Sequence, residues 1–499
     1  LHRVDRRQRQ MCIRDRKEEA LAWIEDSLKT DAFNFGCLFE KYLITRDETV
    51  LIQLRNLMKR GAPDYEALVL DYTSAGRFEE ALAVAELAIA QPAGEQTLLH
   101  YYKSWCLIRL GKTAEAQIAI ATAEKEPADY CFPNALEAIE ALQCVVDFAG
   151  KAPKALYYLG NLWYDKRRYP TAIAAWERSS REDETFPTVW RNLSLAYFNK
   201  MNRPDEAVAL LEKAFRLDHT DARVLMELDQ LYKRLNRPHI ERLCFLEQHI
   251  DIVMTRDDLY LEYVTLLNQT GQYREAIRRI DQRKFHPWEG GEGKVPAQYQ
   301  LARLELAKEL INRKKYDDAL ALIDECYIYP THLGEGKLPG AQENDFNYYK
   351  AYILQQQGRP EEAHSLFVKA SSGNSQPAAA MYYNDQKPDK IFYQGLAYRK
   401  LGEEEKARSR FNQLITYGEE HLFDRFKMDY FAVSLPDLLI WEDDMDKKNR
   451  IHCNYLMALG HLGLGNRTKA EHFFDIAASM DNNHQGVQIH RKLMNTILS

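Results

Sequence analysis

The 499-residue sequence lacks several features that would assign it to a functional class directly. Its net charge is −7 at pH 7 and its pI is near 6.1, so it has no excess of basic residues for nucleic acid or anionic lipid. No apolar run approaches the roughly 18 residues that a membrane-spanning helix needs. The longest, ALAVAELAIA at 81–90, already contains a glutamate. We therefore expect neither a nucleic acid nor a membrane as partner.

Motifs for covalent, metal or phosphate chemistry are also missing. The eight cysteines show no CxxC spacing, which is typical of reduced thiols in a cytoplasmic protein rather than of a disulfide or zinc framework. The glycine-rich stretches are not a phosphate-binding loop, because Trp288 and Thr331 stand where that loop requires glycine. There is no HExxH motif. We expect no cofactor, no metal and no assignable catalytic residue.

The first residues, LHRVDRRQRQMCIRDR at 1–16, begin without methionine and are rich in arginine. A functional interpretation would be a basic arm for nucleic acid or an address signal. MCIRDR instead resembles the translated adapter remnants found at the ends of genes assembled from environmental DNA. We predict that 1–16 is a non-native leader, that the natural protein continues upstream, and that the fold begins at residue 17.

A helix–turn–helix unit recurs along the rest of the chain. Examples are ALYYLGNLWYDKRRYPTAIAAWERS at 155–179 and IFYQGLAYRKLGEEEKARSRFNQLI at 391–415. Each has an apolar stripe at helical spacing, a tight polar turn, and a small residue early in the second helix. A larger side chain there would force the two paired helices apart. That residue recurs at Ala81, Ala116, Ala172, Ala207, Ala276, Ala319, Ala363, Ala407 and Ala470, with a weaker unit near Glu241.

These units resemble the tetratricopeptide repeat (TPR), whose signature has the same order of aromatic, small and alanine positions. The resemblance implies an all-α, TPR-like α-solenoid of about ten helical hairpins that forms an elongated superhelix over residues 17–499. The first helices of the hairpins would line a concave groove.

The spacing between units changes along the chain. Over 17–281 the hairpins are regular apart from one extra helix expected near 133–148. Over 282–499 they are longer and contain an insertion near 421–448. We therefore divide the sequence into a leader at 1–16, a regular array at 17–281 and a longer array at 282–499.

Two near-identical loops, GEGKVP at 291–296 and GEGKLP at 334–339, connect consecutive hairpins of the second array. Glycine lets successive amides turn toward one point, so the loops could hold an anion beside Lys294 or Lys337. An aromatic platform with carboxylates would instead suit a sugar, and a third possibility is a purely structural joint. The candidate residues here are Trp288, Glu292, Lys294, Glu335, Lys337, Glu343 and Asp345.

The second array carries a narrower resemblance. FHPWEGGEGK at 285–294, YPTHLGEGKLPGAQEND at 329–345 and DYFAVSLPDLLIWEDD at 429–444 resemble the C-terminal tail of a group of large bacterial proteins. Those proteins join an uncharacterised, mutarotase-like β-sandwich region to a TPR array. The resemblance implies a bacterial, carbohydrate-related setting and a missing N-terminal domain, and it transfers no catalytic residue.

These features favour a protein-interaction scaffold that binds a partner protein or peptide, or its own missing N-terminal domain. The expected groove-facing residues of the first helices are Tyr157, Asn161, Tyr164, Arg191 and Asn199. A carbohydrate-binding or glycoside-processing protein is the alternative, and its carboxylates would have to lie ~5–10 Å apart in one pocket. A structural tail that orders or oligomerises a larger protein is a third possibility.

Overall fold

The computed structural model describes residues 16–58, 61–91, 96–288, 290–379, 385–425 and 440–494. Within these ranges the chain consists of α-helices and one short 3-10 helix, Thr331–Leu333, without any β-strand. It forms two compact units, Leu1–Met201 and Asn202–Ser499, which we call unit 1 and unit 2. The prediction of an all-α, TPR-like solenoid is confirmed. None of the described helices is both long and apolar enough to cross a membrane.

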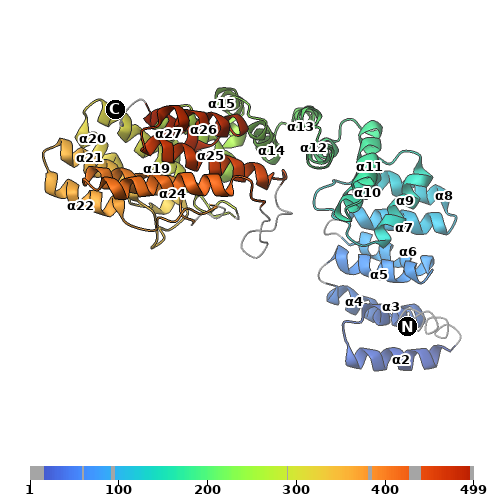
Figure 1. Ribbon diagram of the computed structural model, residues 1–499. Helices are drawn as coiled ribbons and strands as arrows, with labels where there is room; N and C mark the ends of the chain where they lie inside the picture. The colour runs from blue at the N-terminus through green and yellow to red at the C-terminus, as the bar shows by residue number, and fades with distance from the viewer. Residues whose placement is uncertain are drawn as a thin grey trace. The chain divides into compact units, whose positions relative to one another are not determined.

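Unit 1 is a series of antiparallel helical pairs with some additional helices (Figure 1). Its pairs are α5 (Ala62–Ser74) with α6 (Phe78–Ile89), α7 (Thr97–Arg109) with α8 (Thr113–Ala123), and α10 (Pro153–Asp165) with α11 (Tyr169–Glu182). The other helices are α2 (Lys17–Thr30), α3 (Phe35–Thr45), α4 (Glu48–Leu57), α9 (Glu137–Ala149) and α12 (Pro187–Met201).

Unit 2 continues the same pattern after α13 (Pro204–Leu217). Its pairs are α14 (Ala222–Arg234) with α15 (His239–Gln248), α17 (Asp257–Gln269) with α18 (Tyr273–Asp281), α19 (Lys294–Asn312) with α20 (Tyr316–Cys326), α21 (Asn344–Gln356) with α22 (Pro360–Ser371), α23 (Pro388–Lys400) with α24 (Glu404–His421), and α25 (Met445–Gly463) with α26 (Arg467–Met480). A short α16 (Ile250–Val253) and the final α27 (Gln485–Leu493) complete the unit.

The small residues of the repeat lie where paired helices come closest. Each of the nine marker alanines, from Ala81 to Ala470, is at most 2% exposed. The first helix contributes a small residue too. A Cβ atom on Gly160 would lie 2.2 Å from Nε1 of Trp176, and one on Gly395 would lie 2.4 Å from Cε1 of Phe411. The pattern in the sequence therefore marks the points of closest helix packing.

The turns between paired helices are equally regular. Between α10 and α11, Arg167 adopts a positive φ of 58° and the N–H of Arg168 bonds to the carbonyl of Trp163 at 2.8 Å. Between α23 and α24, Gly402 (φ 80°) precedes the equivalent bond from Glu403 to Tyr398, at 2.9 Å. One residue in the left-handed region is enough to end a helix and reverse the chain.

Irregular segments lie between some of the helical pairs that the structure describes. The extra helix is α9, and it packs between α7 and α10. Of the predicted insertion at 421–448, residues 426–439 lie outside the described ranges. The change to longer hairpins at 282 falls inside unit 2, where α19 and α25 have 19 residues each and α10 in unit 1 has 13.

The C-terminal part of unit 2 lies against α14 and α15, the helical pair near the start of the unit. The sequence did not predict this contact. Figure 1 shows α25, α26 and α27 beside α14 and α15. Trp441 is 1% exposed, and its Nε1 donates to the carbonyl of Glu227 on α14 at 3.1 Å. Arg234 on the same helix donates to Oδ1 of Asp443 at 2.6 Å.

Helix α27 packs against the first helices of several hairpins of unit 2, namely α19, α23 and α25. The ring of His490 lies 5.7 Å from that of Phe392 on α23 and 5.8 Å from that of Tyr455 on α25. Gln485 accepts a hydrogen bond from Gln298 on α19 at 2.8 Å. The groove expected from the first helices is therefore occupied, over this part of unit 2, by the C-terminal segment of the same chain.

Candidate functional site

The twin loops are in direct contact. The N–H of Phe285 donates to the carbonyl of His332 at 2.8 Å, and the N–H of Gly293 donates to a carboxylate oxygen of Glu335 at 2.7 Å. Gly334 (φ 77°) lies so close that a Cβ atom there would be 2.7 Å from the carbonyl oxygen of Phe285. The two loops therefore lie side by side.

The two GEGK stretches nevertheless have different structural roles. Lys294 is exposed and is the first residue of α19, preceded by Gly293 in the left-handed conformation. Lys337 remains in a loop, where its Nζ donates to the carbonyl of Tyr327 at 3.0 Å and forms an ion pair with Glu343. Glu335 already accepts the Gly293 N–H, as a carboxylate does at a helix N-terminus. That amide is not available to an anion.

The other candidate residues of the loops are mostly engaged in packing. Asp345 is buried and forms an ion pair of 2.6 Å with Lys390, and its Oδ1 has no hydrogen-bond partner among the described residues. Glu292 is exposed. The half-buried ring of Trp288 covers Gly291, where a Cβ atom would lie 2.3 Å from Cε2 of the indole. A sugar or anion site on the loops stays a prediction, and their mutual contacts support a joint between hairpins.

A second set of candidates comes together on the first helices of unit 1. Oδ1 of Asn161 on α10 accepts hydrogen bonds from Nδ2 of Asn192 on α12 at 3.0 Å and from Nε1 of Trp176 at 3.2 Å. Nη1 of Arg191 donates to Oδ1 of Asn192 at 3.2 Å. We call Tyr157, Asn161, Arg191 and Asn192 the amide patch; apart from Tyr157 its members are half-buried.

Aromatic rings border the amide patch. Tyr157 is 8% exposed and packs edge-on against Tyr158 and Phe186, with ring centroids 5.2 Å and 4.9 Å away. Burial raises the pKa of its hydroxyl, while Asn161 and Arg191 oppose that rise. The neutral phenol therefore forms a wall of the patch.

Tyr164 and Asn199 complete the predicted set in unit 1. The ring of Tyr164 lies 4.9 Å from that of Tyr169 and 5.3 Å from that of Trp176. Asn199 is half-buried on α12, about two helical turns beyond Asn192. Asn192 is not among the residues predicted from the sequence, although its place on the first helix of the next unit was a signal for it.

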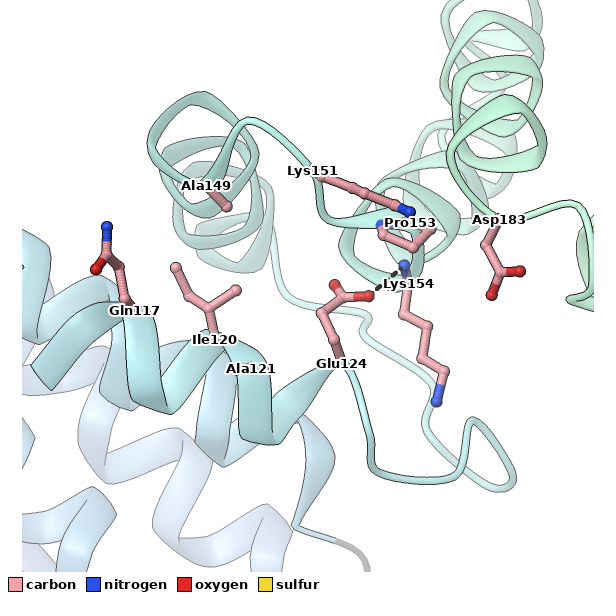
Figure 2. Close-up of a pocket in the computed structure, with 9 residues that line it drawn as sticks. All are labelled: Gln117, Ile120, Ala121, Glu124, Ala149, Lys151, Pro153, Lys154 and Asp183. Atoms are coloured by element: carbon pink, nitrogen blue, oxygen red, sulfur yellow. Dashed lines mark hydrogen bonds between the residues drawn. The ribbon is translucent and has the colours of Figure 1, made fainter. Parts of the chain in front are cut away.

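A cavity of about 370 Å³ lies beside α8 and the start of α10 (Figure 2). Its lining is Gln117, Ile120, Ala121, Glu124, Ala149, Lys151, Pro153, Lys154 and Asp183. The cavity exists because α8 packs against α7 but has little contact with α9, the helix that follows it. Elsewhere in unit 1, α6 packs firmly against α7, and α11 packs firmly against α12. The long step between Ala116 and Ala172 was the sequence signal for this gap.

Glu124, a half-buried carboxylate in the lining of this cavity, has a structural role. Glu124 accepts the backbone N–H groups of Lys154 and Ala155 at 2.9 Å and 3.0 Å, and the hydroxyl of Tyr101 at 2.8 Å. Burial raises the pKa of the Glu124 carboxyl against these bonds. Glu124 thus stabilises the first turn of α10 and is not free to bind a ligand.

A more apolar groove of about 720 Å³ follows the outer face of α9. Ile108, Leu136, Ile139 and Phe148 supply its apolar surface, and Leu136 is 65% exposed. Glu140 at its edge forms an ion pair of 3.1 Å with Arg109. The inserted helix thus leaves an open apolar surface in unit 1.

Metal-ligating groups and cysteines are dispersed among the described residues. No group of three or more His, Cys, Asp or Glu side chains there is placed to hold a metal ion. The seven described cysteines are free, and burial raises the pKa of the Cys106 thiol to about 12. A buried, protonated thiol is a poor nucleophile.

The comparison with protein families supports this assignment of the fold. Residues 391–417, which span most of α23 and α24, match the tetratricopeptide repeat family. Similar solved structures include MamA from Desulfovibrio magneticus RS-1, which is 16% identical over 40% of this chain and 97% of its own, with a TM-score of 0.24. The TPR domain of P58(IPK) is 12% identical over 91% of this chain and 97% of its own, with a TM-score of 0.25.

A third similar structure is the C-terminal part of a TPR repeat-containing protein from Cytophaga hutchinsonii. It is 16% identical over 64% of this chain and all 100% of its own length, with a TM-score of 0.23. The assignment does not depend on these superpositions. It depends on the family match at residues 391–417 and on the alanine-marked hairpins, which together show an all-α fold of TPR-like hairpins in the described part of the chain.

Proposed function

We propose that this chain is a protein-interaction scaffold and that the amide patch of unit 1 binds a peptide segment of a partner protein. The observation that carries the proposal is the convergence of Asn161, Asn192 and Arg191 from two successive first helices. Each amide side chain offers both a donor and an acceptor, which is the combination that an extended peptide backbone requires.

The chemistry of the patch limits the kind of partner segment. A guanidinium binds a carboxylate through parallel N–H groups, so Arg191 favours an acidic side chain or a C-terminal carboxylate. The rings of Tyr157 and Tyr164 border the amides and favour a neighbouring apolar or aromatic residue. The hydrogen bonds within the patch fix its side chains before binding, which lowers the entropic cost of association.

A selection experiment tests this proposal. A library of displayed peptides is selected on the full chain, and the affinities of the selected peptides are then measured for an Arg191→Glu variant and for an Arg181→Glu control. Arg181 is an exposed arginine on α11 in the same unit. We expect Arg191→Glu to weaken binding by about tenfold or more and Arg181→Glu to leave it unchanged. Equal affinities for both variants would rule out the amide patch as the site.

The setting of the scaffold is a further part of the proposal. The resemblance of the sequence from residue 285 onward to bacterial proteins with a mutarotase-like region supports a carbohydrate-related context. In that context the partner is either a separate protein or another domain of the same polypeptide. Scattered, free cysteines support a cytoplasmic location. Co-expression of the chain with such a β-sandwich domain, followed by a pull-down, distinguishes an associating domain from an unrelated one.

A further inference from the structure

The segment that joins α26 to α27 is bound to the helices at the start of unit 2 through its asparagines. Asn482 makes two hydrogen bonds with Asn236. Its N–H donates to Oδ1 at 3.1 Å and its Nδ2 donates to the backbone carbonyl at 2.8 Å. Nδ2 of Asn236 in turn donates to the carbonyl of Met480 at 3.2 Å. The backbone of this segment is therefore fixed by one side chain that follows α14.

The next residue, Asn483, has partners for both ends of its side-chain amide. Its Oδ1 accepts from Nη1 of Arg242 at 2.7 Å, and its Nδ2 donates to the carbonyl of Lys233 at 3.0 Å. Its own carbonyl accepts from Nε2 of Gln269 at 2.9 Å. The guanidinium of Arg242 supplies a donor and the carbonyl of Lys233 supplies an acceptor. Only a carboxamide side chain satisfies both at once.

The donor in this arrangement is held in place by buried charges. Arg242 is 0% exposed, and it donates to Oδ2 of Asp229 at 2.6 Å and to Oε1 of Glu262 at 2.7 Å. Glu262 also accepts from Lys233 at 2.8 Å. These contacts fix the direction of the guanidinium whether or not Asn483 is present, as a preformed binding site requires.

Further contacts extend along α27. Gln485 exchanges hydrogen bonds with Gln298 at 2.8 Å and 3.0 Å, and Nε2 of Gln488 lies 3.2 Å from Nε2 of His239. Lys492 donates to the hydroxyl of Tyr273 at 3.1 Å. The segment thus behaves as a peptide that starts with an asparagine-containing turn, closed by the N–H of Asn483 on Oδ1 of Asp481 at 2.9 Å, and continues as a helix.

We propose that α14, α15, α17 and α19 form a peptide-binding site specific for an asparagine in a short turn that precedes a helix, and that residues 480–494 occupy this site in cis. The partner of the site is a peptide with the chemistry of that segment, Asn-Asn-His-Gln followed by an amphipathic helix. The proposal does not depend on the amide patch, which lies in unit 1.

The cis segment competes with any such peptide. A tethered segment acts at an effective concentration of roughly millimolar, so a peptide in trans binds the wild-type chain weakly. Changes that weaken the cis segment without altering the site should expose it. The discrimination should be sharp, because an aspartate in place of asparagine would direct an oxygen at the carbonyl of Lys233 and leave two acceptors facing each other.

The test uses the full chain with Asn482→Ala, Asn483→Ala and Gln485→Ala combined. A fluorescent peptide of residues 480–494 is titrated against this variant and against the wild type, and binding is followed by anisotropy. We expect the variant to bind the peptide about tenfold more tightly than the wild type does. A peptide carrying the Asn483→Asp change should bind the variant at least about tenfold more weakly than the unchanged peptide.

Two outcomes would overturn the proposal. One is a folded variant that binds neither peptide, and the other is a variant that binds both peptides equally, which would show apolar association of α27 alone. If the triple variant does not fold, the single change Asn483→Ala replaces it, with the same two peptides and the same expectations. Failure of the peptide selection that tests the amide patch has no bearing on these results.

Discussion

Arg242 and Asn483 are hydrogen-bonded at 2.7 Å although 241 positions separate them in the sequence. The same guanidinium is paired with Asp229 at 2.6 Å and with Glu262 at 2.7 Å. Burial raises the pKa of Glu262, but Lys233 and Arg242 outweigh it and lower that pKa to about 2. The contact that joins the two ends of unit 2 therefore rests on a buried network of charges.

Replacing the arginine at the centre of this network should destabilise unit 2 severely. In Arg242→Met the carboxylate of Asp229, which is 1% exposed, loses its partner inside the protein. A buried charge left unpaired costs about 3–5 kcal/mol. The midpoint of urea unfolding, followed by circular dichroism, measures the effect.

The control for that experiment is Arg359→Met. Arg359 pairs with Glu362 on the surface, with exposed fractions of 48% and 57% for the two side chains. We expect no measurable change in the unfolding midpoint, because exposed ion pairs contribute little. Equal loss of stability in the two variants would show that the buried network has no special role.

Gly160→Ala should destabilise unit 1 even though alanine favours a helix. The added Cβ would lie 2.2 Å from Nε1 of Trp176, and that indole is held by hydrogen bonds to the carbonyl of Tyr157 and to Asn161. Overpacking of a core costs about 1–3 kcal/mol, which exceeds the gain of about 1 kcal/mol in helix propensity.

Gly336→Ala is the matched control for that change, measured by thermal unfolding of both variants. An added Cβ at Gly336 would meet no atom within 4 Å, and the residue does not have a positive φ. Its unfolding temperature should equal that of the wild type. A Gly160→Ala variant as stable as the wild type would contradict the close packing of α10 on α11.

Glu335→Ala should weaken the contact between the twin loops. It removes the carboxylate that accepts the N–H of Gly293 at the start of α19. Loss of such a cap costs about 0.5–2 kcal/mol. Hydrogen exchange at the amides of Gly293, Lys294, Val295 and Ala297 should rise locally.

Glu292→Ala supplies the comparison, because Glu292 is an exposed acid in the same loop. Exchange in this variant should match the wild type. If both variants exchange alike, the carboxylate of Glu335 does not hold the joint, and its role as a ligand-binding group becomes the better hypothesis.

The stability of unit 2 should fall in mild acid because of His490. Burial, with a smaller contribution from Lys308 and against the opposing effect of Asp389 and Glu305, lowers the pKa of His490 from an ordinary 6.5 to about 4. Between pH 6.5 and 4 the unfolded chain binds a proton that the folded chain does not bind. Stability therefore rises with pH, and about 3 kcal/mol is lost as the pH falls through this window.

The variant His490→Phe should lose less stability than the wild type between pH 7 and pH 4.5, as judged from urea midpoints. A phenyl ring can keep the aromatic contacts with Phe392, Tyr393 and Tyr455. Burial lowers the pKa of His452 to about 4 as well, so part of the pH dependence should remain. His364→Phe, a change at an exposed position on α22, should show the wild-type pH dependence.

Local features of the fold could be predicted from particular residues. Ala172 and Ala407 mark their helical pairs in the sequence, and both are completely buried where the paired helices meet. The contact between the twin loops, made by Gly293 and Glu335, could also be predicted from the sequence, because the loops follow equivalent second helices of neighbouring pairs. Such contacts join segments about one repeat apart, so the repeat period itself brings them together.

The charged core of unit 2 could not be predicted in this way. Lys308 and Glu305 are each less than 10% exposed and form an ion pair with one another, although their sequence reads as the polar face of α19. A charged side chain is normally expected at the surface. Its burial becomes favourable only when a partner and a covering element are present, and neither is encoded at that position.

The sequence by itself determined the hairpins of this protein, their order and the small residues at which they pack. These follow from helical periodicity and steric contact, which act between neighbours in the chain. Only the tertiary structure decided that Asn483 meets Arg242 and that α27 covers the first helices of unit 2. That contact depends on the accumulated rotation of many successive pairs, and no local pattern of residues carries this information.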